Sequence, residues 1–543
     1  MKTRLCILLA VSVALMSLPW LAPHCGALAL VGLIPLLCAD RLADGCGIRR
    51  FTLWVYAAFV GWNALTTWWI CEATVGGGIF AILANAFQMA LIWAVFRLAK
   101  KRLKGCLPYI FLAAMWIAWE KWYFTAAEVS WPWLALGGAF ARTTSLVQWY
   151  SATGLLGGSV WIWAVNLSVF GMMVALSDGR FTLAWTKAGR ILAAAGITLL
   201  IAGPVILSEV MYGRYTERCE YGSLKVELAQ SNFDPYEKFH AYTQHQQNLQ
   251  VTNLIDSLWN NAPDGYDRPL LVVTPETFTS DVVLNNPNSS PTLAEFKATL
   301  GRRPNTNLLL GASTWEYSSK ASRPTPYSRK SGDRWVDNHN SAIMTDASGR
   351  IDVYHKSKLV VGTELMPWPR IIRPIDDALG GVIGRCSPQE EPSVLTVNDF
   401  APDGCLRREI PVGVAICYES VYGEYCREYV TRGAQALCVI TNDGWWGDTP
   451  GYRQHFSYSR LRAIETRRDI ARCANTGISA FIDQKGDVIR ESGWWQPALL
   501  EGEVSLTGHE SPFIRYGDIA GRACVLLFAL LAAAALIPFK KRN

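Results

Sequence analysis

The sequence is poor in charge for its length. Only 18% of its 543 residues are charged, while 50% are apolar, which is too apolar for an ordinary soluble protein of this size. It has no low-complexity tract and no Gly-X-Y period, and 12% of it is aromatic, which excludes disordered and fibrous classes. A net charge of +6 is small for this length and does not indicate a nucleic-acid partner. The mean hydropathy, +0.14, predicts an apolar part joined to a polar part.

Metal-ligand spacings are missing as well. The seven histidines form no HExxH pair, and no two cysteines have CxxC spacing. We therefore expect neither a metal centre nor another cofactor.

Eight apolar runs are long enough, or nearly so, to cross a bilayer as helices. A crossing helix needs about 17–25 mainly apolar residues. The runs are 4–22, 26–39, 51–71, 77–98, 107–124, 153–176, 189–208 and 523–539. The second is short for a span. The sequence thus predicts seven transmembrane helices in residues 1–208, a polar block over 209–522, and a last helix with a basic tail over 523–543.

Basic residues occupy alternate connections between these runs, which sets orientation by the positive-inside rule. The basic set is Lys2, Arg4, Arg41, Arg49, Arg50, Lys100, Lys101, Arg102, Lys104, Arg180, Lys187, Arg190, Lys540, Lys541 and Arg542. The short connections at 22–26 and 72–76 carry none. Both termini are therefore expected in the cytoplasm, with the polar block on the other side. The alternative for the first run is a cleaved signal peptide, but the next apolar run follows almost at once and no convincing cleavage site separates them.

The polar block has the pattern of an α/β domain. Strands are expected at 225–230, 270–274, 307–312, 341–345, 412–416, 436–441 and 478–483, with helices at 237–260 and 454–470. The strands are too apolar to have one wet face, which indicates a sheet covered on both sides. In open α/β sheets, functional residues follow strand ends.

Three residues stand at or near such ends: Glu276 in TPET, Lys356 in YHKSKLV and Cys417 in VGVAICYES. Each alone has an ordinary structural explanation: a carboxylate in a turn, a lysine on the surface or a small thiol in the core. Together they supply what thiol acyl transfer needs: a nucleophile, a base for its proton and a cation for the oxyanion.

Longer motifs carry a family resemblance. They are FTAAEVSWPWLALG at 124–137, AQSNFDPYEKF at 229–239, TPE at 274–276, YHKSKLVVGTELMPWP at 354–369, ICYE at 416–419, TNDGWWG at 441–447, RQHF at 453–456, RAIETRRDIAR at 462–472 and FIRYGD at 513–518. The polar block resembles the nitrilase, or carbon-nitrogen hydrolase, superfamily. The whole chain resembles the apolipoprotein N-acyltransferase family.

The resemblance implies an α/β fold in which an eight-helix transmembrane bundle holds an inserted nitrilase-like α-β-β-α sandwich. Carried over position by position, it implies Cys417 as nucleophile, Glu276 as base and Lys356 as the oxyanion-stabilising group. It also implies supporting roles for four residues: Asn340, Glu364, Tyr418 and Glu419. The implied location is the bacterial inner membrane, with the polar block in the periplasm and the chain a monomer.

The implied activity is transfer of an acyl chain from a membrane phospholipid to an S-diacylglyceryl apolipoprotein, through a cysteine thioester. Three alternatives stay open. Cys417 could pair with His455 or His355 as in papain-like enzymes, or the thioester could go to water in a membrane-bound hydrolase. The chain could also be a non-catalytic scaffold that handles lipoproteins.

The polar block contains an odd number of cysteines, which leaves at least one thiol free in a monomer without intermolecular bridges. They are Cys219, Cys386, Cys405, Cys417, Cys426, Cys438 and Cys473. Cys386 with Cys405 is the pairing we expect, although the sequence does not determine connectivity.

Overall fold

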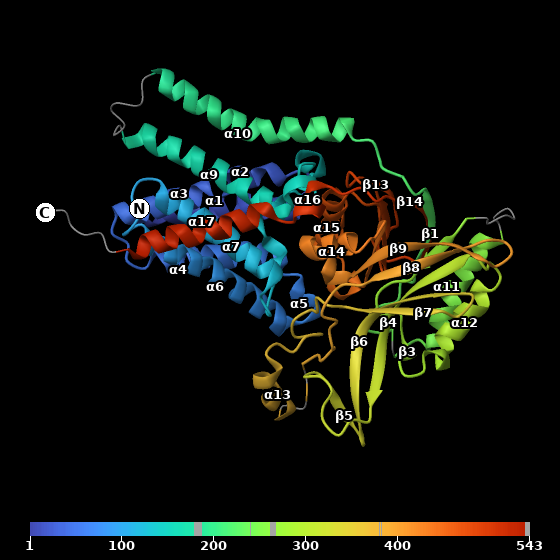
Figure 1. The fold of residues 1–543 in the computed structure, drawn as a ribbon. Helices are drawn as coiled ribbons and strands as arrows, with labels where there is room; N and C mark the ends of the chain where they lie inside the picture. The colour runs from blue at the N-terminus through green and yellow to red at the C-terminus, as the bar shows by residue number, and fades with distance from the viewer. Residues whose placement is uncertain (179–186, 239, 261–267, 379–380, 382, 538–543) are drawn as a thin grey trace. The chain divides into compact units, whose positions relative to one another are not determined.

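The computed structural model describes residues 1–178, 187–238, 240–260, 268–378, 381 and 383–537. The chain divides into two compact units (Figure 1). The first comprises Met1–Tyr215 with Tyr516–Asn543, and the second comprises Thr216–Arg515. Arg180 and the basic residues Lys540, Lys541 and Arg542 lie outside the described residues.

The first unit is helical. Its α-helices are α1 (Lys2–Leu21), α2 (Ala29–Gly32), α3 (Ile34–Gly45), α4 (Phe51–Thr67), α5 (Ile70–Ala73), α6 (Val75–Ala99), α7 (Leu107–Thr125), α8 (Tyr150–Thr153), α9 (Leu155–Asp178), α10 (Lys187–Arg214) and α17 (Ile519–Leu536). The long helices are apolar around most of their circumference, as helices in lipid are. The last helix, α17, packs on α7, where the rings of Phe111 and Phe528 lie 5.4 Å apart.

Six stretches of the described chain are long and apolar enough to cross a membrane. They are Lys2–Leu21, Gly26–Gly45, Val75–Ala99, Leu155–Ser177, Ala188–Arg214 and Ile519–Leu536. The predicted count of eight is therefore not confirmed. The other two predicted runs are helical, but α4 has only 17 residues, and α7 carries Glu120 and Lys121 in its last turns.

The predicted span at 26–39 is a broken helix. A 3-10 turn, α2 and α3 follow one another from Gly26 to Gly45. Asn166 of α9 repairs the break: its Oδ1 accepts a hydrogen bond from Leu33 N at 2.8 Å, and its Nδ2 donates to Ala29 O at 2.9 Å. A broken helix is tolerated in a membrane where a neighbouring side chain satisfies the freed backbone groups in this way.

The charged pair near the end of α7 is held by different partners. Glu120 is buried and accepts hydrogen bonds from Trp116 Nε1 at 3.0 Å and Leu136 N at 2.8 Å. Lys121 lies 3.3 Å from Asp518, the residue that caps α17. The two side chains therefore fasten this end of α7 to two separate segments.

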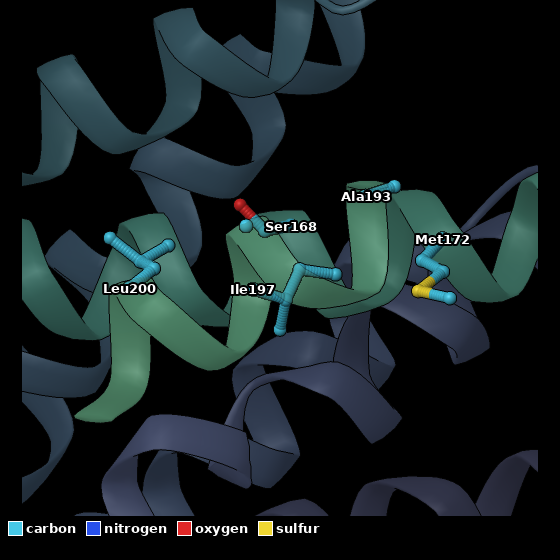
Figure 2. Close-up of a pocket in the computed structure, with 6 residues that line it drawn as sticks. Ser168, Met172, Ala193, Ile197 and Leu200 are labelled. Carbon is cyan, nitrogen blue, oxygen red and sulfur yellow. The ribbon is translucent and has the colours of Figure 1, made fainter. Parts of the chain in front are cut away.

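An open crevice lies between α9 and α10 (Figure 2). Ser168 and Met172 line it from α9, and Ala193, Ile197 and Leu200 line it from α10. Its lining contains one hydroxyl but no acid, base or thiol, so it has the character of a surface for apolar chains and not of a reaction site.

The second unit contains two β-sheets. The first has the order β14-β1-β2-β4-β6-β5, with β3 paired to β4 and β7 paired to β6, and the second has the order β13-β12-β11-β10-β9-β8. The strands of the first sheet are β1 (Ser223–Gln230), β2 (Leu270–Val273), β3 (Thr279–Val283), β4 (Thr306–Ser318), β5 (Arg329–Ser331), β6 (Arg334–Asp346), β7 (Ile351–His355) and β14 (Ala498–Ser505). Those of the second are β8 (Val394–Phe400), β9 (Leu406–Ile416), β10 (Ala436–Thr441), β11 (Ile470–Ala474), β12 (Ala480–Ile482) and β13 (Val488–Glu491).

The two sheets pack against each other and carry helices outside. Cys473 of β11 lies against β1 and β2, with its Sγ 3.3 Å from Val273 O. The first sheet is covered by α11 (Gln244–Trp259) and α12 (Pro291–Leu300), which form one apolar core with it. The second is covered by α14 (Gly423–Thr431) and α15 (Pro450–Thr466). This is the layering of a nitrilase-like domain. Two further helices are α13 (Pro369–Ala378) and α16 (Pro512–Tyr516).

Each predicted strand overlaps an observed one, but half of the fourteen strands in the described residues were not predicted. Those missed are β3, β5, β7, β8, β11, β13 and β14. Both predicted helices have wrong ends. The helix expected at 237–260 begins only at Gln244, where Thr243 caps it. The helix expected at 454–470 ends at Thr466, because the backbone of Arg467 adopts the left-handed conformation with φ 49°.

Candidate active site

The pairing of strands brings the predicted residues to neighbouring strand ends. Glu276 follows β2 and is 6% exposed, and Lys356 follows β7 and is 1% exposed. The strands β2, β4, β6 and β7 are consecutive neighbours in the first sheet. Cys417 follows β9 in the second sheet. The site therefore forms where strand ends from both sheets meet.

Lys356 is the centre of a buried ion-pair network. Its Nζ lies 3.0 Å from Glu276 Oε1 and 2.9 Å from Glu364 Oε2. The side-chain Nδ2 of Asn340, in β6, donates to Oε1 of both carboxylates at 2.7 Å. One ammonium and one amide thus hold the two acids in fixed positions. Backbone groups complete the network, because Glu276 Oε2 accepts from Asn442 N at 3.0 Å and Glu364 Oε2 from Val360 N at 2.8 Å.

Cys417 occupies a strained position. Its φ is 51°, in the left-handed region that few residues other than glycine adopt. Such a conformation costs about 1–3 kcal/mol and is found mostly at functional sites. Here the chain leaves β9 and turns at once into a short 3-10 helix, Cys417–Val421. A sharp turn between a strand and a helix is a known way to present a nucleophile.

The surroundings of the Cys417 thiol have opposing effects on its pKa. Burial raises the pKa of the Cys417 thiol well above its usual value, the charge of Glu276 raises it further, and Lys356 acts in the opposite direction. Burial by itself would lower the pKa of Lys356, but Glu276, Glu364 and Cys417 together raise it well above its usual value. The resting site therefore holds a neutral thiol beside a charged ammonium, and thiolate formation requires a base.

Glu419 links the loop of Lys356 to the strand of Cys417. Its Oε1 accepts hydrogen bonds from Tyr354 Oη at 2.6 Å and Ser357 N at 2.7 Å, and its Oε2 accepts from Ile416 N at 2.8 Å. It is fully buried, and burial raises its pKa. It therefore joins the loop that follows β7, in the first sheet, to the end of β9, in the second.

Tyr418 has a different environment. It is 4% exposed, and its ring meets that of Tyr422 edge to face at a centroid distance of 5.1 Å. The structure therefore brings Asn340, Glu364 and Glu419 into the polar network and places Tyr418 in an aromatic contact.

Three buried polar residues near the site were not predicted: Asn442, Asp443 and Arg472. A fourth, His455, was considered only as an alternative thiol partner. Asn442 clamps Glu276 through its backbone N–H, as given above. Asp443, His455 and Arg472 form a cluster with side chains that are fully buried. All four stand in the TNDGWWG, RQHF and RAIETRRDIAR motifs, and Asn442 directly follows a strand end, so the motifs were the available signal.

The two histidines considered as thiol partners lie in different places. His455 Nε2 is 3.1 Å from the carbonyl oxygen of Cys417, and its Nδ1 is 2.8 Å from Asp443 Oδ1. His355 stacks on His339 at a centroid distance of 4.1 Å. Burial lowers the pKa of His355 to about 3, and His339 adds to this effect.

Ligand atoms of Cys417, Asp443 and His455 lie within 4.8 Å of one another, close enough to hold a metal ion. A cation already occupies this cluster, however. Arg472 Nη2 lies 2.6 Å from Asp443 Oδ2, so the guanidinium neutralises the carboxylate that a metal would need.

The expected disulfide is absent. In the described part of the chain all cysteines are free thiols, including Cys386 and Cys405. Cys386 belongs to the site's surroundings instead, because its backbone N donates to Glu364 O at 2.8 Å. Burial raises the pKa of its thiol to about 12.

Known protein families match both units of the chain. A family model described as carbon-nitrogen hydrolase matches residues 257–511, and one described as the apolipoprotein N-acyltransferase N-terminal domain matches residues 12–168. The chain is 26% identical to the apolipoprotein N-acyltransferase of Chlorobaculum tepidum over 518 residues, which is 95% of this chain and 93% of the relative. It is also 26% identical to that of Geobacter metallireducens over 534 residues, 96% of this chain and 93% of the relative.

Among solved structures, Saccharomyces cerevisiae Nit3, a member of branch 10 of the nitrilase superfamily, is 16% identical. The match covers 59% of this chain and 97% of Nit3, with a TM-score of 0.36. One family model matches within the first unit and the other within the second. The two relatives match nearly the full length of the chain. This chain therefore belongs to the apolipoprotein N-acyltransferase family, and its second unit carries that family's carbon-nitrogen hydrolase domain.

Proposed function

We propose that this chain moves an acyl chain from a membrane phospholipid to the N-terminal amine of an S-diacylglyceryl apolipoprotein, through a thioester on Cys417. One observation carries the proposal. Lys356 and Glu276 form a buried ion pair. Both charges act on the thiol of Cys417, whose backbone is in the left-handed conformation, in a chain that belongs to the acyltransferase family. Glu276 is the base, Lys356 the oxyanion-stabilising group and Cys417 the nucleophile.

In the first half-reaction, Glu276 takes the proton of the Cys417 thiol and the thiolate attacks the ester carbonyl of the phospholipid. Lys356 stabilises the oxyanion of the tetrahedral intermediate, since its ammonium stays charged when buried between two carboxylates. The C–O bond then breaks. The leaving alkoxide takes the proton from Glu276 and departs as lysophospholipid, leaving the acyl group on sulfur.

In the second half-reaction, the amine of the apolipoprotein attacks the thioester carbonyl. Glu276 accepts the proton that the amine loses, and Lys356 again stabilises the oxyanion. The C–S bond breaks, an amide forms, and the Cys417 sulfur recovers its proton. No cofactor enters the balance, because the ester supplies the energy stored in the thioester. The kinetics should be ping-pong.

The membrane part fits the substrates, because both carry acyl chains that stay in the bilayer while their reacting groups leave it. We assign residues 1–208 and 523–543 to eight crossings, 209–522 to the periplasm and both termini to the cytoplasm. The six long apolar stretches and the alternation of basic connections support this topology. We further assign the chain as a monomer of the bacterial inner membrane.

The test is product analysis with both substrates. Purified protein is incubated with phospholipid and a diacylglyceryl-cysteine peptide, and lysophospholipid, free fatty acid and acylated peptide are measured. We expect lysophospholipid and N-acylated peptide in equal amounts. Free fatty acid with unmodified peptide would instead identify a hydrolase, and no release of lysophospholipid would leave the scaffold alternative.

A further inference from the structure

Three motifs of the second unit contribute one residue each to a cluster that the proposed chemistry does not use. Asp443 follows β10, His455 lies in α15 and Arg472 lies in β11. All three side chains are fully buried. Burying charged groups destabilises the folded state unless every member of the cluster is paired. The location of this cluster next to Cys417 therefore indicates that it has a function.

The cluster forms a chain of contacts that ends on the backbone of Cys417. Arg472 Nη2 donates to Asp443 Oδ2 at 2.6 Å, and Asp443 Oδ1 lies 2.8 Å from His455 Nδ1. On the other side of the ring, His455 Nε2 is 3.1 Å from the carbonyl oxygen of Cys417. Ser420 Oγ donates to the same oxygen at 2.8 Å.

The identity of these partners sets what the imidazole does. Burial by itself would raise the pKa of Asp443, but His455 and Arg472 hold it below its usual value. Ser420 Oγ lies 3.0 Å from Nε2 and gives its one proton to the Cys417 carbonyl. Because that carbonyl oxygen only accepts hydrogen bonds, Nε2 is placed to donate to it. Arg472 Nη2 also lies 3.2 Å from Nδ1, but its contact with the Asp443 carboxylate is shorter.

An Nε2 that donates to this carbonyl has no lone pair free to take the proton of the thiol. Its donation to the carbonyl of Cys417 instead fixes the orientation of the peptide that follows the nucleophile. Holding that peptide in place restrains the backbone of Cys417, whose φ is 51°, and with it the direction of the Cα–Cβ bond that carries Sγ.

We propose that His455 is a positioning residue, which holds Cys417 in its left-handed conformation through the Cys417 carbonyl. Asp443 and Arg472 fix the ring in the orientation that this contact needs. The inference rests on the proposed function, because it takes Cys417 to be the nucleophile.

The test compares His455→Gln, which keeps a donor for the carbonyl, with His455→Leu, which removes it. His245→Gln and His245→Leu are the matched controls, since His245 is 62% exposed and pairs with Glu295. Two rates are measured in the full chain, each as a function of pH. The first is the single-turnover rate of acyl transfer from phospholipid to Cys417. The second is the rate at which iodoacetamide alkylates Cys417, followed by peptide mass spectrometry.

We expect His455→Leu to lower the acylation rate about 100-fold, as a displaced nucleophile does. His455→Gln should stay within about tenfold of wild type, because one hydrogen bond is kept. The pH midpoint of acylation should be the same in His455→Gln as in wild type. If His455→Gln instead loses acylation completely together with one limb of the pH profile, His455 is the base and the proposal is overturned.

Unchanged acylation in His455→Leu would also overturn it. Should His455→Leu not fold, Asp443→Asn provides the second variant, with a reduced rate expected because the ring loses its anionic partner. Failure of the proposed function has a different signature. Wild type would then form no acyl-enzyme, while the alkylation rate of Cys417 would still report whether His455 positions its sulfur.

Discussion

Removal of the Lys356 charge tests the ion-pair network most severely. Lys356→Met keeps the length of the side chain but leaves Glu276 and Glu364 buried without a cation. Both carboxylates lie 2.7 Å from one nitrogen of Asn340, so their oxygens are on the order of 4–5 Å apart. At an effective dielectric constant of about 20, two such charges repel by roughly 3–4 kcal/mol.

The free energy of unfolding should therefore fall by about 3–5 kcal/mol, the usual result of removing one partner from a buried pair. Lys356→Met with Glu364→Gln should regain about 3 kcal/mol, because only one carboxylate then remains. Neither variant should form an acyl-enzyme, since both lack the oxyanion-stabilising ammonium. Glu364→Gln alone is the control, because Lys356 keeps its contact with Glu276.

The deficit of Lys356→Met should depend on pH with a defined sign. In that variant the two carboxylates repel, so the folded state takes up a proton more readily than the unfolded state. Stability is then lost as pH rises from about 5 to about 8. In wild type the pKa of Lys356 is raised, so its contribution is present below the unfolded pKa and is lost only as pH rises through the folded pKa.

Thermal unfolding in detergent at several pH values measures both effects. We expect the melting temperature of Lys356→Met to fall by roughly 5–10 °C at neutral pH. The reasoning is refuted if the double variant melts no higher than Lys356→Met, or if the deficit shrinks as pH rises.

Three further changes have defined outcomes. Glu276→Gln removes a charge that raises the pKa of the Cys417 thiol, so iodoacetamide should alkylate Cys417 faster near about pH 8 while acyl-enzyme formation is lost; slower alkylation would contradict this. Gly311→Ala places a Cβ 2.8 Å from the Cα of Glu276, so acylation should fall about 100-fold, whereas Gly301→Ala, whose nearest contact is 3.4 Å, should acylate normally. Glu419→Gln turns an amide toward buried N–H donors and should lower the free energy of unfolding by about 1–3 kcal/mol, measured by denaturant titration; unchanged stability would argue against its linking role.

The sequence suggested residues for the candidate site but not their arrangement. Glu276 and Cys417 were proposed because each follows a predicted apolar strand, and Lys356, whose strand β7 was not predicted, because its ammonium complements the other two groups. That Asn340 donates to two carboxylates at once depends on the register of β6 against β4 and β7. Register is a property of strand pairing across the sheet, which a single sequence does not reveal.

From the sequence only His455 was considered, as a thiol partner, and its cluster with Asp443 and Arg472 was missed for a related reason. Its members come from a loop, a helix and a strand that meet only when β10 and β11 pair. Each residue alone is an ordinary polar side chain. Only their convergence on the carbonyl of Cys417 distinguishes them.

The helix count illustrates the limit of composition as a signal. Windows of apolar residues predicted eight spans, but two of them contain features that composition averages out. The run at 51–71 is interrupted after Thr67, and α7 carries a Glu and a Lys that pair with other segments. Side-chain partners, which allow charges in an apolar helix, are visible only in three dimensions.

The central claim is that Cys417 carries the acyl group, and intact-mass spectrometry tests it most directly. Wild type and Cys417→Ala are each incubated with phospholipid and no acceptor, and lysophospholipid release is followed in parallel. We expect the mass of wild type alone to rise by one acyl chain, and the added mass to disappear when the diacylglyceryl-cysteine peptide is supplied. A gain of one acyl chain by Cys417→Ala, or lysophospholipid release without any mass gain by wild type, would contradict the account.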